Sequence, residues 1–68
     1  MTVQLTVNGR TVDLVRELSL PEFLATRQID PRHIAVARNG DVLDRERYAD
    51  VVLHAGDVIE IVRMVGGG

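Results

Sequence analysis

Two Asn-Gly dipeptides, Asn8-Gly9 and Asn39-Gly40, constrain the fold of this chain more than any other feature. Both central residues of a type I′ turn have positive φ, which Asn and Gly tolerate, so this dipeptide favours a two-residue hairpin loop. Segments rich in Val, Ile and Leu flank each dipeptide. The sequence therefore predicts two tight β-hairpins along the chain.

The first hairpin has a pattern that agrees with its turn. Polar and apolar residues alternate before Asn8-Gly9 and again up to Leu14. A two-residue turn places Leu5 opposite Val12 and Val3 opposite Leu14, so the apolar side chains meet on one face. The other face is expected to carry Gln4, Thr6, Thr11 and Asp13.

A helix is predicted to begin after Ser19. Ser19 and Glu22 have the spacing of a capping box, and Pro21 falls in the first turn, where its missing N–H is not needed. Leu18 can pack against Phe23 as a hydrophobic staple. These signals make Ser19 a helix cap and not a nucleophile.

The body of this helix has one apolar face, formed by Leu20, Phe23 and Leu24 at helical spacing. We expect the helix to end near Gln28, because the residue before Pro31 disfavours the α region.

The second half of the chain is predicted to form shorter elements. Residues 34–38 form a strand, and residues 41–43 return after the second Asn-Gly turn, with Val36 opposite Leu43. Residues 44–48 resemble a capped helical or 3₁₀ turn. The secondary structure of the apolar segment 51–53 is ambiguous from its sequence, and a turn follows at 55–57.

Residues 58–65 form the strongest strand signal, with β-branched residues at both parities. A strand that is apolar on both faces suits the centre of a sheet, here beside the first strand. The expected class is α+β, a β-grasp (ubiquitin-like) fold with a mixed four- to five-stranded sheet and one helix on one face. We expect a single domain over residues 1–65 and a flexible glycine tail over residues 66–68.

Size and composition exclude several classes of function. A chain of 68 residues is one domain with a thin core, and it contains no cysteine, which excludes a thiolate metal site or a Cys nucleophile. All eight basic residues are Arg, and the net charge of −2 shows no basic stripe for nucleic acid. No membrane span or secretory signal is present, so a cytoplasmic location is expected.

The C-terminal Gly66-Gly67-Gly68 is the feature that carries chemistry. Glycine lacks a Cβ, so such a tail can enter a channel too narrow for other residues. The terminal carboxylate is ionised at pH 7 and can attack the α-phosphorus of ATP when a partner enzyme holds both. The alternative interpretation is a frayed or processed chain end.

The sequence resembles the ThiS family of thiamin-biosynthesis sulfur carriers over nearly its whole length. The residues that carry the resemblance are Ala37-Arg38-Asn39-Gly40-Asp41-Val42-Leu43, the Arg45 to Tyr48 turn, Gly56-Asp57-Val58-Ile59-Glu60-Ile61 and the terminal Gly67-Gly68.

The resemblance implies a carrier that is not itself an enzyme and binds no cofactor. An E1-like (ThiF-type) adenylyltransferase would use ATP to adenylylate Gly68, with Gly67 as the slender residue behind it. A sulfur donor such as a cysteine desulfurase would supply the sulfur for a thiocarboxylate. Thiazole synthase (ThiG-type) would accept that sulfur; no nucleic acid or membrane takes part.

A partner-binding surface is expected beside the tail. If Ile59 and Ile61 face the core, Val62 and Met64 project from the opposite face. There they can form an apolar patch together with Ala35 and Ala37. The alternative interpretation is that these are scattered apolar residues of an ordinary protein surface. The residues expected to contact partners are Val62, Met64, Val65 and Gly66.

Other polar residues give weaker signals. His33 and His54 have no ligand spacing around them and are expected at the surface, and Arg63 is either a partner contact or plain surface. Most acidic side chains of the second half are expected to be solvated, and some can steer a basic partner: Asp41, Asp44, Glu46, Asp50, Asp57 and Glu60.

Several functions stay open at this point. Sulfur carriers for molybdopterin or cysteine synthesis share the fold and the tail, so only the resemblance favours thiamin. A β-grasp binding module with an inert tail and a conjugating modifier are the other classes. The absence of lysine means that the chain cannot build lysine-linked chains on itself.

Overall fold

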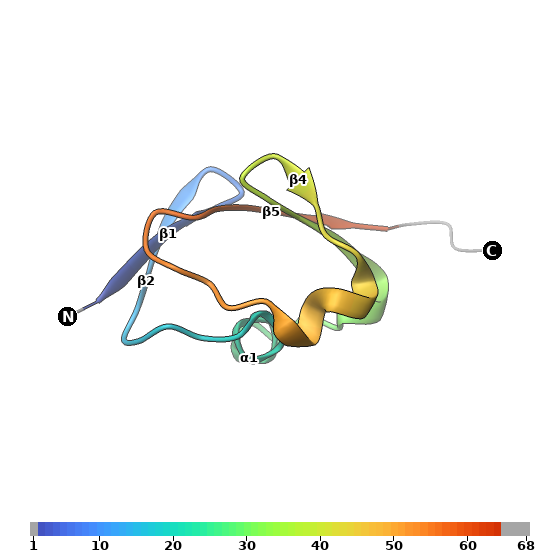
Figure 1. Cartoon of the computed structure of the whole chain (residues 1–68), viewed down its shortest axis with the longest axis horizontal. Helices are drawn as coiled ribbons and strands as arrows, with labels where there is room; N and C mark the ends of the chain where they lie inside the picture. Colours follow the sequence, from blue (N-terminus) through green and yellow to red (C-terminus); the bar gives the residue numbers. More distant parts are fainter. Residues whose placement is uncertain (1, 65–68) are drawn as a thin grey trace.

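The last strand of the chain, β5, lies at the centre of a five-stranded mixed sheet (Figure 1). The computed structural model describes residues 2–64, and the strand order is β2-β1-β5-β3-β4. In chain order the elements are β1 (Val3–Val7), β2 (Arg10–Leu14), α1 (Leu20–Thr26), the 3₁₀ helix η1 (Pro31–His33), β3 (Ile34–Arg38), β4 (Asp41–Val42), the 3₁₀ helix η2 (Arg45–Asp50) and β5 (Val58–Arg63).

The topology confirms the expected α+β class. β5 pairs in parallel with β1, where Val7 is opposite Ile59, and antiparallel with β3, where Val36 is opposite Ile61. Figure 1 shows the sheet as one layer, with α1 and η2 together on one side of it. The first and last strands are therefore neighbours, as the apolar character of the last strand predicts.

The first hairpin has the turn and register that the sequence predicts. Asn8 and Gly9 have φ values of 50° and 82°, and Leu5 pairs with Val12. Leu5 is buried, whereas the residues of the other parity face away from α1. Turn chemistry and hydrophobic alternation select the same register, which is why this part of the fold is readable from the sequence.

The second hairpin is confirmed, with a shorter return strand than expected. Asn39 and Gly40 have φ values of 51° and 89°, and the Leu43 N–H donates to the Val36 carbonyl oxygen at 2.9 Å. Regular pairing in β4 nevertheless stops at Val42. The following η2 is a 3₁₀ helix as predicted, although its N-cap makes no side-chain capping bond.

The start of α1 is the predicted capping box. The Glu22 N–H donates to Ser19 Oγ at 3.2 Å, and the Ser19 N–H donates to Glu22 Oε1 at 2.9 Å. The bond from the Ser19 backbone, followed by that from Arg16, lowers the pKa of Glu22. Two otherwise free N–H groups are thus satisfied at the helix start.

α1 ends close to Gln28, as expected, but for another reason than the one predicted from the sequence. The helix stops at Thr26, and Gln28 takes a left-handed φ of 57°. The Ile29 N–H donates to the Leu24 carbonyl and the Gln28 N–H to the Ala25 carbonyl, which is a Schellman motif. The expected stop signal, Asp30-Pro31, begins η1 instead, with Asp30 as its cap.

Asp30 caps η1, the 3₁₀ helix that leads into β3. Its Oδ1 accepts from the Arg32 N–H at 2.9 Å, and its Oδ2 accepts from the Arg32 guanidinium at 2.9 Å. These hydrogen bonds lower the pKa of Asp30 to about 2. The carboxylate therefore stays charged and keeps the cap formed throughout the neutral range.

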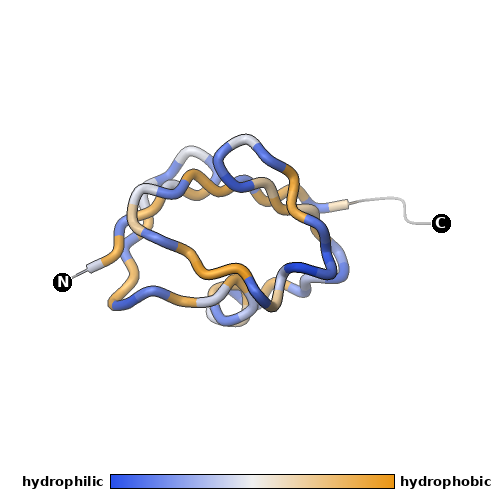
Figure 2. The backbone as a smooth tube through the Cα atoms, in the orientation of Figure 1, coloured by the Kyte–Doolittle hydropathy of each residue, from blue (hydrophilic) through white to orange (hydrophobic). Residues whose placement is uncertain are grey.

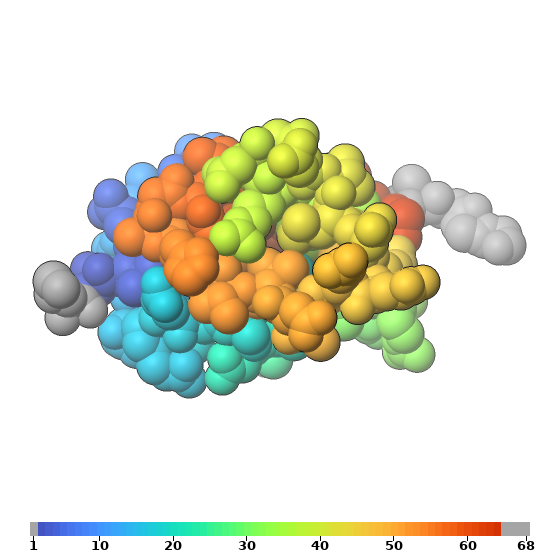
Figure 3. Space-filling model, viewed as in Figure 1, coloured from blue at the N-terminus to red at the C-terminus, as the bar shows by residue number. Residues whose placement is uncertain are grey.

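The core lies between the sheet and the layer that holds α1. The segment between η2 and β5 closes this layer, because the Leu20 N–H donates to the Val51 carbonyl and the Leu53 N–H donates to the Leu18 carbonyl. Figure 2 shows apolar stretches along this segment and along β5, and Figure 3 shows its side chains at the surface beside those of β4. The most deeply buried side chains are Leu5, Leu20, Phe23, Leu24, Val36, Leu53 and Ile59.

The described part of the chain leaves the predicted domain boundary untested. Regular β5 structure ends at Arg63, and the strand was expected to reach Val65, which lies outside the described residues. The predicted domain over residues 1–65 and tail over residues 66–68 therefore stay predictions.

The capping box offers a direct test of the helix account. Ser19→Ala removes the acceptor for the Glu22 N–H, and N-cap losses of this kind cost about 1 kcal/mol. We expect the melting temperature, followed by circular dichroism, to fall by about 4–8 °C for a chain of this size. Ser19→Thr keeps a hydroxyl and is expected to stay near the wild type. Equal melting of all three proteins would contradict the account.

Candidate functional site

The residues expected to carry the chemistry, Gly67 and Gly68, lie outside the described residues, as do Val65 and Gly66. The structure instead shows what precedes them. β5 runs through the middle of the sheet and leads directly to Met64, the last described residue. The candidate site is therefore described by how β5 is held and by what its two faces present.

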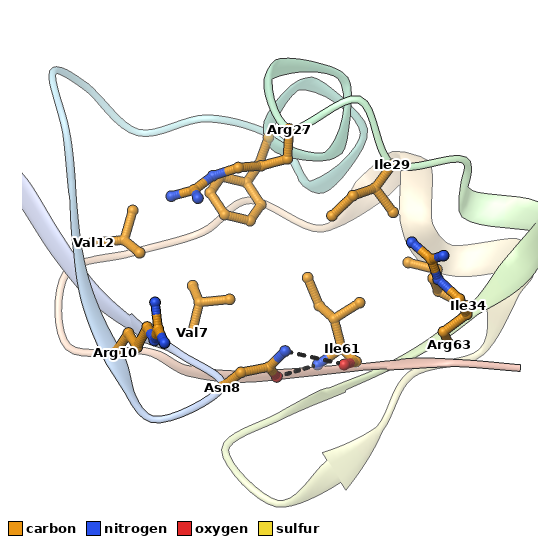
Figure 4. Close-up of a pocket in the computed structure, with 10 residues that line it drawn as sticks. Val7, Asn8, Arg10, Val12, Arg27, Ile29, Ile34, Ile61 and Arg63 are labelled. Carbon is orange, nitrogen blue, oxygen red and sulfur yellow. Dashed lines mark hydrogen bonds between the residues drawn. The ribbon is translucent and has the colours of Figure 1, made fainter.

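Asn8 holds β5 from the β1 side. Its side-chain Oδ1 accepts from the Ile61 N–H at 2.7 Å, and its Nδ2 donates to the Ile61 carbonyl oxygen at 3.1 Å (Figure 4). Its own N–H donates to the Ile59 carbonyl at 2.9 Å. The turn residue thus extends the pairing of β5 beyond the end of β1.

Asn39 holds β5 from the β3 side in the same way. Its Oδ1 accepts from the Val58 N–H at 2.8 Å, and its N–H donates to the Val58 carbonyl at 2.8 Å. The two turn asparagines therefore brace one strand from opposite edges. The sequence showed only their turn role, because their side-chain bonds depend on strand order.

Asp57, just before β5, is the exception among the acidic residues of the second half of the chain. It is only 7% exposed, and it accepts from the His54 N–H at 2.9 Å and from Asn39 Nδ2 at 3.3 Å. Its carboxylate also forms an ion pair with Arg38 at 3.3 Å. Asp57 is thus a structural anchor, whereas the other acidic residues of this set are exposed as expected: Asp41, Asp44, Glu46, Asp50 and Glu60.

Met64 is anchored at the end of β5. Its N–H donates to the His33 carbonyl at 2.9 Å, and Arg45 Nη2 lies 3.9 Å from its sulfur. Arg45 also donates to the carbonyls of Arg32 and Ile34, at 2.8 and 3.2 Å. The described chain is therefore held by hydrogen bonds up to its last residue, Met64.

The sheet face opposite α1 carries the expected apolar patch. Val62 and Met64 are 61% and 47% exposed, and Val62 pairs with Ala35 across the sheet. Ile59 is fully buried and Ile61 is partly buried on the other face. A shallow hollow of about 130 Å³ on the open face is lined by Ala35, Val36, Ala37, Val42, Glu60 and Val62.

We call the apolar residues of this side, the half-buried Ala35 and Ala37 and the exposed Val42, Val62 and Met64, the open-face patch. Sequence reasoning missed Val42, which is 77% exposed and pairs with Ala37. The return register after Asn39-Gly40 was the signal that could have placed it there. The geometry of the patch is as predicted; its role in binding stays a prediction.

The histidines lie at the surface, as expected. His54 Nδ1 lies 2.7 Å from Glu17 Oε2, and His33 Nδ1 lies 3.9 Å from Asp30 Oδ2. Among residues 2–64 no three acidic or imidazole side chains gather in a group that could hold a metal ion. Within the same residues, every buried polar side-chain atom has a hydrogen-bond partner.

The comparison with known proteins decides the family. The model of the ThiS family matches residues 3–68. The chain belongs to the ThiS family. The sulfur carrier protein ThiS of Bacillus subtilis (strain 168) is 38% identical over 65 residues, which cover 94% of this chain and 98% of that protein. The chain is thus a sulfur carrier of thiamin biosynthesis, a non-catalytic protein.

Two further relatives extend the comparison. The thiazole synthase of Paramagnetospirillum magneticum is 32% identical over 66 residues, which span 97% of this carrier but only 20% of that enzyme. The crystal structure of the thiamine biosynthesis protein ThiS from Geobacter metallireducens matches with a TM-score of 0.81 and 33% identity, covering 97% of this chain and 100% of that one. The second match confirms the β-grasp fold.

The described part of the carrier contains no candidate membrane-spanning helix. None of its helices between residues 2 and 64 has the length and hydrophobicity needed to cross a membrane.

The asparagine braces can be tested one strand position at a time. Asn8→Gly keeps a residue that tolerates positive φ but removes both side-chain bonds to Ile61, at a cost of about 1 kcal/mol. We expect faster hydrogen exchange at the Ile61 amide, measured by NMR.

The matched control for this test is Asn39→Gly, which removes the acceptor for the Val58 N–H. It is expected to speed exchange at Val58 more than at Ile61. Identical exchange patterns in the two variants would show that the side chains do not brace β5 locally.

Proposed function

We propose that this carrier is activated at Gly68 by an E1-like adenylyltransferase and delivers sulfur as a terminal thiocarboxylate to thiazole synthase. The single observation that supports this most is the path of β5, a strand held on both edges that leads to the glycine tail. Such a body works as a rigid handle, and the tail is the part that enters a partner's active site. Gly67 and Gly66 give that tail its narrow cross-section.

The chemistry requires no catalytic group on the carrier. The Gly68 carboxylate attacks the α-phosphorus of ATP, and pyrophosphate leaves, which gives an acyl adenylate. A persulfide sulfur on the donor then attacks the acyl carbon, and AMP leaves. A thiol cleaves the resulting acyl disulfide, so that the carrier keeps a thiocarboxylate and the two electrons come from thiol oxidation. ATP belongs to the activating partner, and the reaction sequence fits a cytoplasmic location.

The open-face patch is the proposed contact for the activating enzyme. Its central side chain, Val62, lies on β5, the strand that precedes the tail in the sequence, and is more than half exposed. Burial of an exposed apolar surface of this kind in a complex is favourable, because it removes apolar area from water. Val65 and Gly66 are expected to extend the contact toward the reactive end.

The proposal of thiazole synthase as acceptor is supported by the relatives. Two curated thiazole synthases, from Paramagnetospirillum magneticum and Magnetococcus marinus, contain a region similar to this carrier. A carrier region joined to its acceptor enzyme raises the local concentration of one for the other. A sulfur carrier for molybdopterin or cysteine synthesis would instead deliver its sulfur to a different acceptor enzyme.

The proposed mechanism has a direct mass test. Incubation with ATP, the E1-like enzyme of the same organism and a cysteine desulfurase with cysteine is expected to add the mass difference between sulfur and oxygen, located in the C-terminal peptide. The matched control carries one extra bulky residue after Gly68 and is expected to stay unmodified. Absence of the mass change in a donor system that charges another carrier would favour an inert tail.

The open-face patch has its own test. Val62→Asp places an unpaired carboxylate in the proposed contact, and we expect kcat/KM for adenylylation to fall about tenfold, which corresponds to about 1.4 kcal/mol. Val15→Asp is the matched control, because Val15 is 84% exposed but lies outside the sheet. Equal rates for the two variants would show that activation does not use this face.

A further inference from the structure

A second apolar surface lies on the other face of β5, between the sheet and α1. It is a hollow of about 380 Å³ that opens to solvent, a volume within the range of small-molecule sites. Figure 4 shows side chains from the sheet and from the α1 side that point into it. Its apolar floor is formed by Val7, Val12, Phe23, Ile29, Ile34 and Ile61.

Three arginines, Arg10, Arg27 and Arg63, line this hollow, which we call the arginine hollow. Figure 4 places Arg10 and Arg27 toward one end and Arg63 toward the other. Arg27 lies over the Phe23 ring, with its guanidinium carbon 5.2 Å from the ring centre. No acidic side chain lines the hollow within the described residues.

The arginines of the hollow differ from most others in the chain. Within residues 2–64, Arg16, Arg32 and Arg38 form ion pairs, and Arg45 donates to backbone carbonyls. Among the same residues, the arginines without a side-chain hydrogen bond or ion pair are Arg10, Arg27, Arg47 and Arg63, and all but Arg47 line the hollow. The hollow therefore gathers cationic groups that the described fold does not use.

The edge of β5 beside the hollow has room for pairing beyond the end of β1. Peptide groups of alternate residues in a strand point to opposite edges. Those of Ile61 point to the β1 side, where they bond to the Asn8 side chain. Those of Arg63 point to the same side, one step beyond Asn8, where β1 has already ended. An extended chain can continue the sheet at this position.

We propose that the arginine hollow docks an extended acidic segment of thiazole synthase, which inserts an apolar side chain into the floor and places carboxylates beside the arginines. Charge complementarity carries the choice of occupant, because guanidinium groups pair with carboxylates and the floor excludes charge. This inference rests on the proposed function for the identity of the acceptor enzyme.

The arginine hollow lies on the opposite face of the sheet from the proposed contact for the activating enzyme. Val62 and Ile61 are neighbours on β5 but point to opposite faces, so the open-face patch and the arginine hollow are separate surfaces. A carrier must leave one enzyme before it serves the next. With two separate surfaces, each enzyme can recognise the carrier through residues that the other enzyme does not contact.

The experiment compares the double variant Arg10→Glu/Arg27→Glu with the wild type. Affinity for the thiazole synthase of the same organism is measured by calorimetry at low and raised ionic strength. Thiocarboxylate formation by the E1-like enzyme is measured by mass in parallel. Arg47→Glu is the matched control, because Arg47 lies in η2, away from the hollow. Circular dichroism confirms that each variant is folded.

The expected result is a loss of synthase affinity of about tenfold or more in the double variant, with a weaker salt dependence and unchanged thiocarboxylate formation. Arg47→Glu is expected to bind like the wild type. Unchanged affinity in the double variant, an equal loss in Arg47→Glu, or a loss in the activation step alone would overturn the inference. Failure of the wild type to form or transfer the thiocarboxylate would instead refute the proposed function.

Discussion

The pairing of β5 with β1 on one edge and with β3 on the other is the interaction on which the rest of the structure depends. The parallel pair joins the first strand to the last, so it brings together residues that lie far apart in the sequence. Asn8 and Asn39 reinforce it, because each uses a side chain to bond to β5 where the regular ladder stops. β5 is thereby held along both of its edges, by backbone pairing and by two side chains.

This arrangement explains how a small protein can serve chemistry without catalysing it. The core uses one face of β5, where Ile59 is fully buried, and leaves Val62 on the other face exposed. No described cluster of side chains offers a metal site, and the buried Asp57 is engaged by Arg38 and Asn39. Under the proposed function, the body contributes shape, charge and a firmly held strand before the tail, and the partner enzymes contribute catalysis.

Local signals made much of the fold readable from the sequence. Asn8-Gly9 and the flanking alternation gave the hairpin register, and Ser19 with Glu22 gave the helix start, because each rests on residues close together in the chain. The left-handed Gln28 was not readable, since glutamine has no special preference for that conformation. The burial of Asp57 and the gathering of Arg10, Arg27 and Arg63 were also missed, because both arise from strand order and not from spacing.

The central claim is that the open face and end of β5 are where the activating enzyme grips the carrier. It is tested most directly by NMR spectra of ¹⁵N-labelled carrier during titration with the unlabelled E1-like enzyme and ATP. The account predicts that the amide signals of Ala35, Ala37, Val62 and Met64 change first and most. Changes centred instead on Val15 or on the solvent side of α1, with these four signals unmoved, would contradict it.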